Sequence, residues 1–382
     1  MNNYLSSHID KLKEAGNFRT IPGCLPSKEF LDLSSNDYLG LSSRWKEMLP
    51  SFFEEFPDYG FSSSASRLLC SKQEAYILME NYLRELYGRP ALLYNSGSHA
   101  NVGIVSSLAK LPNTLMICDK LVHASVIDGI KMSGTPFQRF SHNDLKSLSK
   151  IIEKEKNNYE RIIIIVEAVY SMEGDVSPLR ELCRLKKEYK NIFLYVDEAH
   201  AFGVKGEKGL GLSEALGVIP EIDILAGTLG KAAASAGAFV ICDNLMKDFL
   251  INTSRSFIFS TALPPVNIAW SLFMIKKFIG MREERERLSL LSKKIKETIE
   301  KITGRENPSS SQIIPLVTGN TENALKIASV LKEKHKIIAL PIRRPTVPPG
   351  KEGIRFSLRA DLTDEDIERL QKALTDISDI LK

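Results

Sequence analysis

The run Ile162-Ile163-Ile164-Ile165-Val166 is the feature that most narrows the folds open to this chain. A strand with one wet face alternates apolar and polar residues, whereas this run is apolar throughout, so it predicts a strand buried on both faces. Helix-length segments separate this run from other short β-rich runs, which indicates βαβ units and a mostly parallel sheet. The expected strands are residues 91–95, 114–118, 162–167, 192–196, 222–226 and 238–242, and the expected helices are 73–87, 99–109, 145–155 and 179–188.

After Pro264-Pro265 the pattern of residues changes. A long helix is predicted over 266–302, and its charge run at 281–287 is interpreted as a solvated helix face. Shorter strands (312–317, 336–340, 354–358) and helices (322–334, 364–381) follow. We therefore predict an N-terminal arm at 1–35, a large domain at 36–275 and a smaller α/β domain at 276–382.

Composition excludes several classes of protein. The 382 residues carry 51 Lys and Arg against 47 Asp and Glu, a balance that predicts neither a nucleic-acid nor a membrane partner. The five cysteines are scattered without a C-x-x-C pair, so we expect no disulfide framework and no metal site. The polar, mixed-charge N-terminus has no signal-peptide pattern, and we expect a cytoplasmic protein.

A lysine among small residues is the strongest local sign of chemistry. Lys231 ends the segment Gly227-Thr228-Leu229-Gly230-Lys231, just after a predicted buried strand. Desolvation favours the neutral amine of a lysine, which is the form that Schiff-base chemistry needs. On this segment alone, a loop lysine without a function is an equally good interpretation.

A second signal changes that balance. Asp197-Glu198-Ala199-His200 follows a predicted strand, at the sheet edge where open α/β folds bind ligands. Helicases also carry a D-E-A-H sequence, but they need a phosphate-binding loop of the form G-x-x-x-x-G-K-[ST], and this chain has none. A carboxylate that pairs with the ring nitrogen of pyridoxal 5'-phosphate (PLP), together with a Schiff-base lysine, fits both signals better.

With these two signals, the chain resembles the α-oxoamine synthases, PLP-dependent enzymes of fold type I. The resemblance runs from about residue 31 to the C-terminus and rests on NDYLG (36–40), DKLVHAS (119–125), YSMEGD (170–175), GTLGK (227–231) and STALPP (260–265). It implies a mostly parallel seven-stranded sheet in a large domain with a smaller C-terminal α/β domain. It also implies PLP as the cofactor and a homodimer with the active site at the interface.

The resemblance assigns roles around the cofactor ring. It makes Lys231 the residue that bonds PLP covalently and Asp197 the partner of the ring nitrogen. His123 would stack on the ring and take part in proton transfer; otherwise it is a helix cap or a core residue. His200 and Ser171 would hydrogen-bond the phenolic oxygen, although Ser171 alone could be a simple turn residue.

The phosphate group of PLP would lie at a helix start. Ser96-Gly97-Ser98-His99 follows a predicted strand and opens a helix, where backbone N–H groups can bind phosphate and Gly97 allows close approach. The resemblance adds Ser98 and the Thr228 hydroxyl to this site. It also implies that Ser260 and Thr261 reach the phosphate of a neighbouring subunit.

The C-terminal segments indicate which branch of the family the chain resembles. Residues 342–350 (IRRPTVPPG) and 354–358 (IRFSL) look like those of the branch that works in biotin synthesis and joins L-alanine to a pimeloyl thioester, carried on CoA or a carrier protein. Arg355 matches the arginine that binds the amino-acid carboxylate, for which a guanidinium fork is well shaped. The resemblance also places Arg19, Asn36 and Thr346 at the substrate.

Some positions depart from the family pattern. A Gly-x-His-x-x-His segment, common in the family, is absent after Ala65-Ser66-Arg67, and Ala201 and residues 232–234 replace glycines. The alternatives are a sister synthase that uses glycine or serine, an aminotransferase-like enzyme, or a partner-binding relative without activity. The intact set of Asp197, His200, Lys231 and Arg355 argues against the last.

Overall fold

The computed structural model describes residues 1–21, 29–71 and 73–381, so Cys24 lies outside the described residues. Contacts divide the chain into two units. Unit 1 holds Met1–Asn36, Met172–Asp175 and Glu286–Lys382, and unit 2 holds Asp37–Ser171 and Val176–Arg285. The boundaries predicted at residues 35 and 275 stay predictions.

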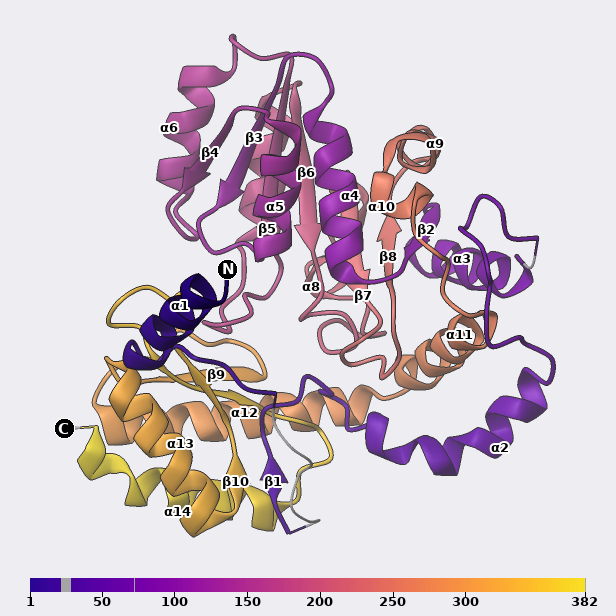
Figure 1. Ribbon diagram of the computed structural model, residues 1–382. Coiled ribbons are helices and arrows are strands. Elements are labelled where there is room, and N and C mark those ends of the chain that lie inside the picture. Colours follow the sequence, from indigo (N-terminus) through magenta and orange to yellow (C-terminus); the bar gives the residue numbers. More distant parts are fainter. Residues whose placement is uncertain (22–28, 72, 382) are drawn as a thin grey trace. The chain divides into compact units, whose positions relative to one another are not determined.

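Unit 2 is built on a seven-stranded sheet with the strand order β2-β8-β7-β6-β5-β3-β4 (Figure 1). Its strands are β2 (Ala91–Tyr94), β3 (Thr114–Asp119), β4 (Phe137–Phe140), β5 (Arg161–Glu167), β6 (Ile192–Asp197), β7 (Ile224–Thr228) and β8 (Ala238–Ile241). Neighbours pair in parallel except that β8 runs antiparallel to both β2 and β7. The predicted α/β fold with a mostly parallel seven-stranded sheet is confirmed.

Strand β4 was not among the strands predicted from sequence. It lies at the edge of the sheet, and three of its four residues are not buried, so it lacks the apolar run that marks the central strands. By contrast, Ile162, Ile164 and Val166 of β5 are all buried, as are the intervening residues, in keeping with a strand covered on both faces.

Helices cover the sheet of unit 2, and α4 and α5 lie beside one another over one face (Figure 1). The cluster of buried residues that they share with β2, β3, β5 and β8 is the core of the unit. The helices are α2 (Trp45–Glu55), α3 (Glu74–Tyr87), α4 (Gly97–Ala109), α5 (Ala124–Ser133), α6 (Leu145–Glu155), α7 (Leu179–Glu188), α8 (Leu212–Ala215), α9 (Asn244–Thr253), α10 (Arg255–Ile258) and α11 (Pro265–Ile279).

The prediction of one long helix over 266–302 is wrong. It is two helices, α11 and α12 (Arg282–Thr303), separated at Gly280 and Met281. Arg285, interpreted as part of a solvated face, is buried and donates hydrogen bonds to the carbonyls of Phe278 (2.6 Å) and Ile279 (3.1 Å) at the end of α11. The last carbonyls of a helix lack partners within it, and at this break the buried guanidinium satisfies them together with the Met281 N–H, which donates to the Phe278 carbonyl (2.9 Å).

Unit 1 contains a three-stranded antiparallel sheet of order β11-β12-β9 and a short parallel pair of β1 with β10. The strands are β1 (Leu31–Asp32), β9 (Ile313–Val317), β10 (Ile337–Ile338), β11 (Leu340–Ile342) and β12 (Gly353–Ser357), and the helices besides α12 are α1 (Asn2–Glu14), α13 (Thr321–His335) and α14 (Asp364–Asp376). Thr363 begins α14 with a capping box to Asp366.

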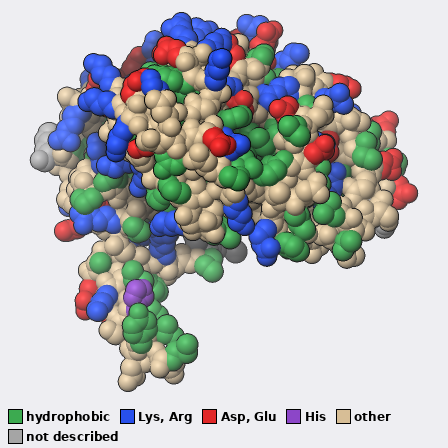
Figure 2. Space-filling view, turned by 90° about the horizontal axis from the view of Figure 1, so that it is seen from above, with side chains coloured by type: hydrophobic (Ala, Val, Ile, Leu, Met, Phe, Trp, Pro, Cys, Tyr) green, Lys and Arg blue, Asp and Glu red, His purple; other side chains and the backbone are tan. Residues whose placement is uncertain are grey.

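Among the described residues, no helix is both long and apolar enough to cross a membrane. Basic and acidic side chains are interspersed over the face of the molecule drawn in Figure 2.

Candidate active site

Lys231 lies in the turn that follows β7. The turn is closed by the backbone hydrogen bond from Leu229 N–H to the Gly237 carbonyl (2.9 Å). The Nζ atom of Lys231 is 2.8 Å from Nε2 of His200, and Nδ1 of His200 is 2.7 Å from the hydroxyl of Tyr38, a fully buried residue. The structure therefore brings Lys231 and His200 together and adds Tyr38, which the sequence analysis named only as part of the NDYLG motif.

Asp197 is the last residue of β6, at the carboxyl end of the parallel strands. Its side chain is buried, and its two oxygens accept hydrogen bonds from Asn101 Nδ2 (2.9 Å) and the Ala199 N–H (2.9 Å). Both donors are neutral, and no cation pairs with this carboxylate within the described residues. A buried carboxylate without a cationic partner is costly unless a ligand supplies the positive charge.

A hydrogen-bonded chain leads from Asp197 to His123. Asn101 also donates to Ser125 Oγ (3.0 Å), which lies 2.7 Å from Nδ1 of His123. His123 is the N-cap residue of α5, and its Nδ1 atom accepts the Ser125 N–H. The histidine therefore does cap the helix, as the alternative interpretation of its sequence position predicted. Asn101 and Ser125 were missed as site residues, although both stand in the quoted motifs SGSHAN and DKLVHAS.

Glu167, at the end of β5, is a second buried carboxyl beside Asp197. The two residues are register partners of adjacent strands. Burial, and then the charge of Asp197, raise the pKa of Glu167 well above its usual range. Its Oε1 atom has no hydrogen-bond partner among the described residues, so an unsatisfied buried polar atom lies at this edge of the sheet.

The predicted phosphate site lies at the start of α4. Gly97 is the first residue of the helix after the N-cap Ser96, whose side chain accepts the His99 N–H. The first N–H groups of a helix have no acceptor within it. A Cβ atom added at Gly97 would lie 3.8 Å from the Thr228 side chain, so the two predicted phosphate residues face each other. Ser98, next along the helix, is exposed.

Ser260, Thr261 and Ser171 lie in other surroundings. Asn95 Nδ2 donates to Ser260 Oγ (2.9 Å) and to the Thr261 carbonyl (2.6 Å). Thr261 also forms a β-bridge with Ser66. Ser171, at the end of a segment of unit 2, is half-buried.

The predicted substrate residues all belong to unit 1, where they form two pairs. Arg355, buried in β12, donates to Asn36 Oδ1 (3.1 Å) and to Ser357 Oγ (2.8 Å). Arg19 donates to Thr346 Oγ1 (3.1 Å) at the surface. A guanidinium held in one orientation has the forked shape that binds a carboxylate through two hydrogen bonds.

Gln73 and Arg67 occupy the segment that lacks the family's histidines. Gln73 Nε2 donates to the carbonyls of Arg67 (2.9 Å) and Cys70 (2.5 Å), and its Oε1 accepts from Arg67 Nε (2.5 Å). Arg67 pairs with Glu80 at 2.9 Å. The loop is therefore closed by an amide where the family commonly has histidines.

Glu198, next to Asp197, gives a prediction about stability. It is fully buried, and burial raises its pKa to about 7, although hydrogen bonds from Ser213 and Leu212 act against the shift. The folded protein then holds this proton above the usual pKa of a free carboxyl group. Stability falls as the pH rises from about 4.5 through 7, by roughly 3 kcal/mol in total.

We expect Glu198→Gln, which cannot ionise, to gain stability relative to the wild type between pH 5 and pH 8. Urea unfolding of both proteins at the two pH values measures this difference, and Glu207→Gln, at an exposed neighbouring position, is the control. A difference between Glu198→Gln and the wild type that stays constant with pH would contradict the raised pKa.

Comparisons with known proteins agree on one family. A family model described as aminotransferase class I and II matches residues 28–374. The 8-amino-7-oxononanoate synthase of Haemophilus ducreyi is 42% identical over 383 residues, covering 96% of this chain and 98% of that protein. The structure of 8-amino-7-oxononanoate synthase from Francisella tularensis matches with a TM-score of 0.77 at 30% identity, covering 92% of this chain and 98% of the other.

A third match is a variant of serine palmitoyltransferase from S. paucimobilis, solved with PLP and myriocin bound. Its TM-score is 0.88 at 26% identity, and the match covers 99% of this chain and 97% of that one.

Proposed function

The chain belongs to the aminotransferase class I and II family and, within it, to the α-oxoamine synthases, and from that membership we propose that it condenses L-alanine with a pimeloyl thioester. The products would be 8-amino-7-oxononanoate, carbon dioxide and the free thiol, a step of biotin synthesis. The chain is a PLP-dependent acyltransferase, which confirms the predicted enzyme class and cofactor. The relative from H. ducreyi supports the choice of substrates through its name.

The residues of unit 2 fit PLP. Asp197 is a buried carboxylate whose hydrogen-bond donors within the described residues are both neutral, and Oε1 of Glu167 is buried and unsatisfied beside it. The protonated ring nitrogen of PLP would supply a positively charged partner. Gly97, Ser98 and Thr228 would hold its phosphate, with Ser260 and Thr261 from a second copy. When bound, PLP accepts the electron pair left at the amino-acid carbon.

Lys231 is the proposed base. It would bond the cofactor in the resting enzyme, remove the proton from the alanine Cα atom and later return a proton to that carbon. The hydrogen bond between Lys231 and His200 is the observation that carries this assignment, because it fixes the position of the amine. Tyr38, on the other ring nitrogen of His200, sets the orientation of the imidazole. His200 and Ser171 would hydrogen-bond the cofactor's phenolic oxygen, and His123 would stack on its ring.

Arg355 is the proposed partner of the alanine carboxylate. Its hydrogen bonds to Asn36 and Ser357 hold the guanidinium in one orientation, so little side-chain freedom is lost when a carboxylate binds. Arg19 and Thr346 form the other substrate pair.

A homodimer is part of the proposal. Large apolar side chains are exposed on the segment of Ser260 and Thr261 and on the segment that pairs with it. The accessible fraction is 80% for Phe61 and Leu69 and 69% for Phe259. The Ala262 N–H bonds the Ala65 carbonyl, so these segments lie together in unit 2. Exposed apolar side chains gathered in one place favour burial against a second subunit.

Two substitutions of Arg355 distinguish what its positive charge and what its forked shape contribute to L-alanine binding. Arg355→Ala should raise KM for L-alanine by about 10- to 100-fold, the value of a charge-assisted pair of hydrogen bonds. Arg355→Lys keeps the charge without the fork and should fall between the wild type and the alanine variant. Thiol release at varied L-alanine measures this, and an unchanged KM in both variants would contradict the role.

The proposed function is tested by thiol release from pimeloyl-CoA that depends on L-alanine. Release that depends on glycine or serine instead would indicate a sister synthase. Amino-group exchange without a thioester would indicate an aminotransferase-like enzyme.

A further inference from the structure

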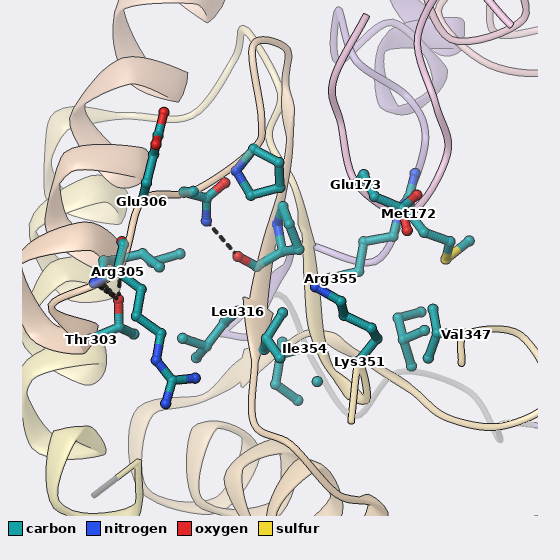
Figure 3. A pocket seen from close by; sticks show the side chains of 17 residues that line it. Met172, Glu173, Thr303, Arg305, Glu306, Leu316, Val347, Lys351, Ile354 and Arg355 are labelled. Carbon is teal, nitrogen blue, oxygen red and sulfur yellow. Dashed lines mark hydrogen bonds between the residues drawn. The ribbon is translucent and has the colours of Figure 1, made fainter. Parts of the chain in front are cut away.

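A pocket of about 220 Å³ lies wholly within unit 1, over the sheet face that carries Arg355 (Figure 3). Register pairs Arg355 with Pro315 and Gly353 with Val317, and all four residues line the pocket. Loops close its sides, including the one that carries Val347 and Lys351. Apart from Arg355, its lining takes no part in the chemistry proposed above.

The lining combines an apolar floor with cations. Val317, Ile342 and Val347 supply aliphatic surface, while Lys351 and Arg305 are exposed. In the described residues, the structure records no acidic partner for either cation, and Figure 3 shows the Arg305 and Glu306 side chains pointing in opposite directions. Glu173 and Glu306 are the two acids of the lining, against the three cations Arg305, Lys351 and Arg355.

An aliphatic chain that ends in a carboxylate matches this lining. Methylene groups gain free energy on the apolar floor, and the lysine ammonium, which reaches toward the middle of the pocket in Figure 3, is a partner for the terminal carboxylate. The volume is below the roughly 300 Å³ at which pockets for drug-sized ligands begin. It therefore suits a short chain and not a whole thioester carrier.

The position of Arg355 connects the pocket to the reaction, and this step rests on the proposed function. Arg355 would hold the carboxylate bonded to the carbon that gains the acyl group, so the acyl chain begins within a few bonds of the guanidinium. We propose that this pocket binds the carboxyl-terminated aliphatic tail of the acyl donor, with Lys351 as the partner of the terminal carboxylate. The pocket would then determine acyl-chain choice.

Equilibrium binding tests the pocket independently of turnover. Pimelate, glutarate and heptanamide are titrated into the PLP-loaded protein by calorimetry. Pimelate should bind more tightly than glutarate, by about fourfold for each methylene buried, and more tightly than heptanamide, which has no carboxylate. Lys351→Ala should weaken pimelate binding at least about fivefold and leave heptanamide unchanged.

Val317→Phe, which places a larger side chain in the floor, should weaken both pimelate and heptanamide. Lys332→Ala, at an exposed lysine of α13 outside the pocket, is the matched control and should change neither. No detectable binding of pimelate to the wild type, or equal binding to wild type, Lys351→Ala and Val317→Phe, would overturn the proposal.

Kinetics provides the second arm. Lys351→Ala should raise KM for pimeloyl-CoA about fivefold while KM for L-alanine and for heptanoyl-CoA stays the same. An unchanged KM for pimeloyl-CoA, with active wild type, would overturn the pocket's role and leave the proposed function standing. If the wild type releases no thiol with either pimeloyl-CoA or a pimeloyl carrier protein, the proposed function fails while the calorimetric series still decides whether the pocket binds such chains.

Discussion

Replacing Lys231 by alanine is expected to lower kcat by at least about a thousandfold while the protein stays folded. The residue would supply both the covalent bond to the cofactor and the base for the Cα proton, and one substitution removes both. Its amine contacts His200 at 2.8 Å at the edge of the site, so truncation leaves the core of unit 2 intact. Thiol release measures kcat, and far-UV circular dichroism measures folding.

Lys208→Ala is the matched control for this prediction, because Lys208 is an exposed lysine of the same unit. It should retain wild-type kcat. Near-normal turnover in the Lys231→Ala variant would remove the basis of the mechanism.

Asp197→Ala is expected to have the second-largest effect, a loss of about 10²- to 10³-fold in kcat. The carboxylate would hold the proton on the ring nitrogen of PLP, which the electron-accepting chemistry requires. Its loss also removes one of the two acceptors of Asn101 Nδ2 and the side-chain acceptor of the Ala199 N–H, so the ring should be less firmly placed.

Steady-state thiol release and the visible absorption of the bound cofactor measure the effect of Asp197→Ala. Asp128→Asn, an exposed aspartate of α5, is the control and should be silent. A variant at Asp197 with unchanged kcat and unchanged absorption would mean that another group pairs with the ring nitrogen.

The central strands could be predicted from sequence because burial on both faces leaves a continuous apolar run, as in β5 and β6. The edge strand β4 could not, since its residues are largely exposed and carry no such run. The break between α11 and α12 was missed because it depends on Arg285, which is buried through tertiary contacts although its neighbours in sequence are all charged.

The residues of the site, like the strands and helices, could be predicted only in part. Lys231, Asp197 and His200 have side chains whose chemistry is specific, so short motifs identify them. Other site residues (Tyr38, Asn101 and Glu167) contact partners that are far away in the chain. Asn101 and Asp197, for example, are 96 positions apart. Their residue types are common in cores and helices, and sequence gives no sign of those partners.

A product assay with three amino acids distinguishes the proposed reaction from those of the sister synthases. Purified, PLP-loaded protein is incubated with pimeloyl-CoA and L-alanine, glycine or L-serine in turn, while free thiol and product mass are followed. We expect thiol release with L-alanine alone and a product with the mass of 8-amino-7-oxononanoate. Release with glycine or serine and none with alanine would contradict the proposed substrate, and silence with all three amino acids, also with a pimeloyl carrier protein as donor, would contradict the proposed reaction.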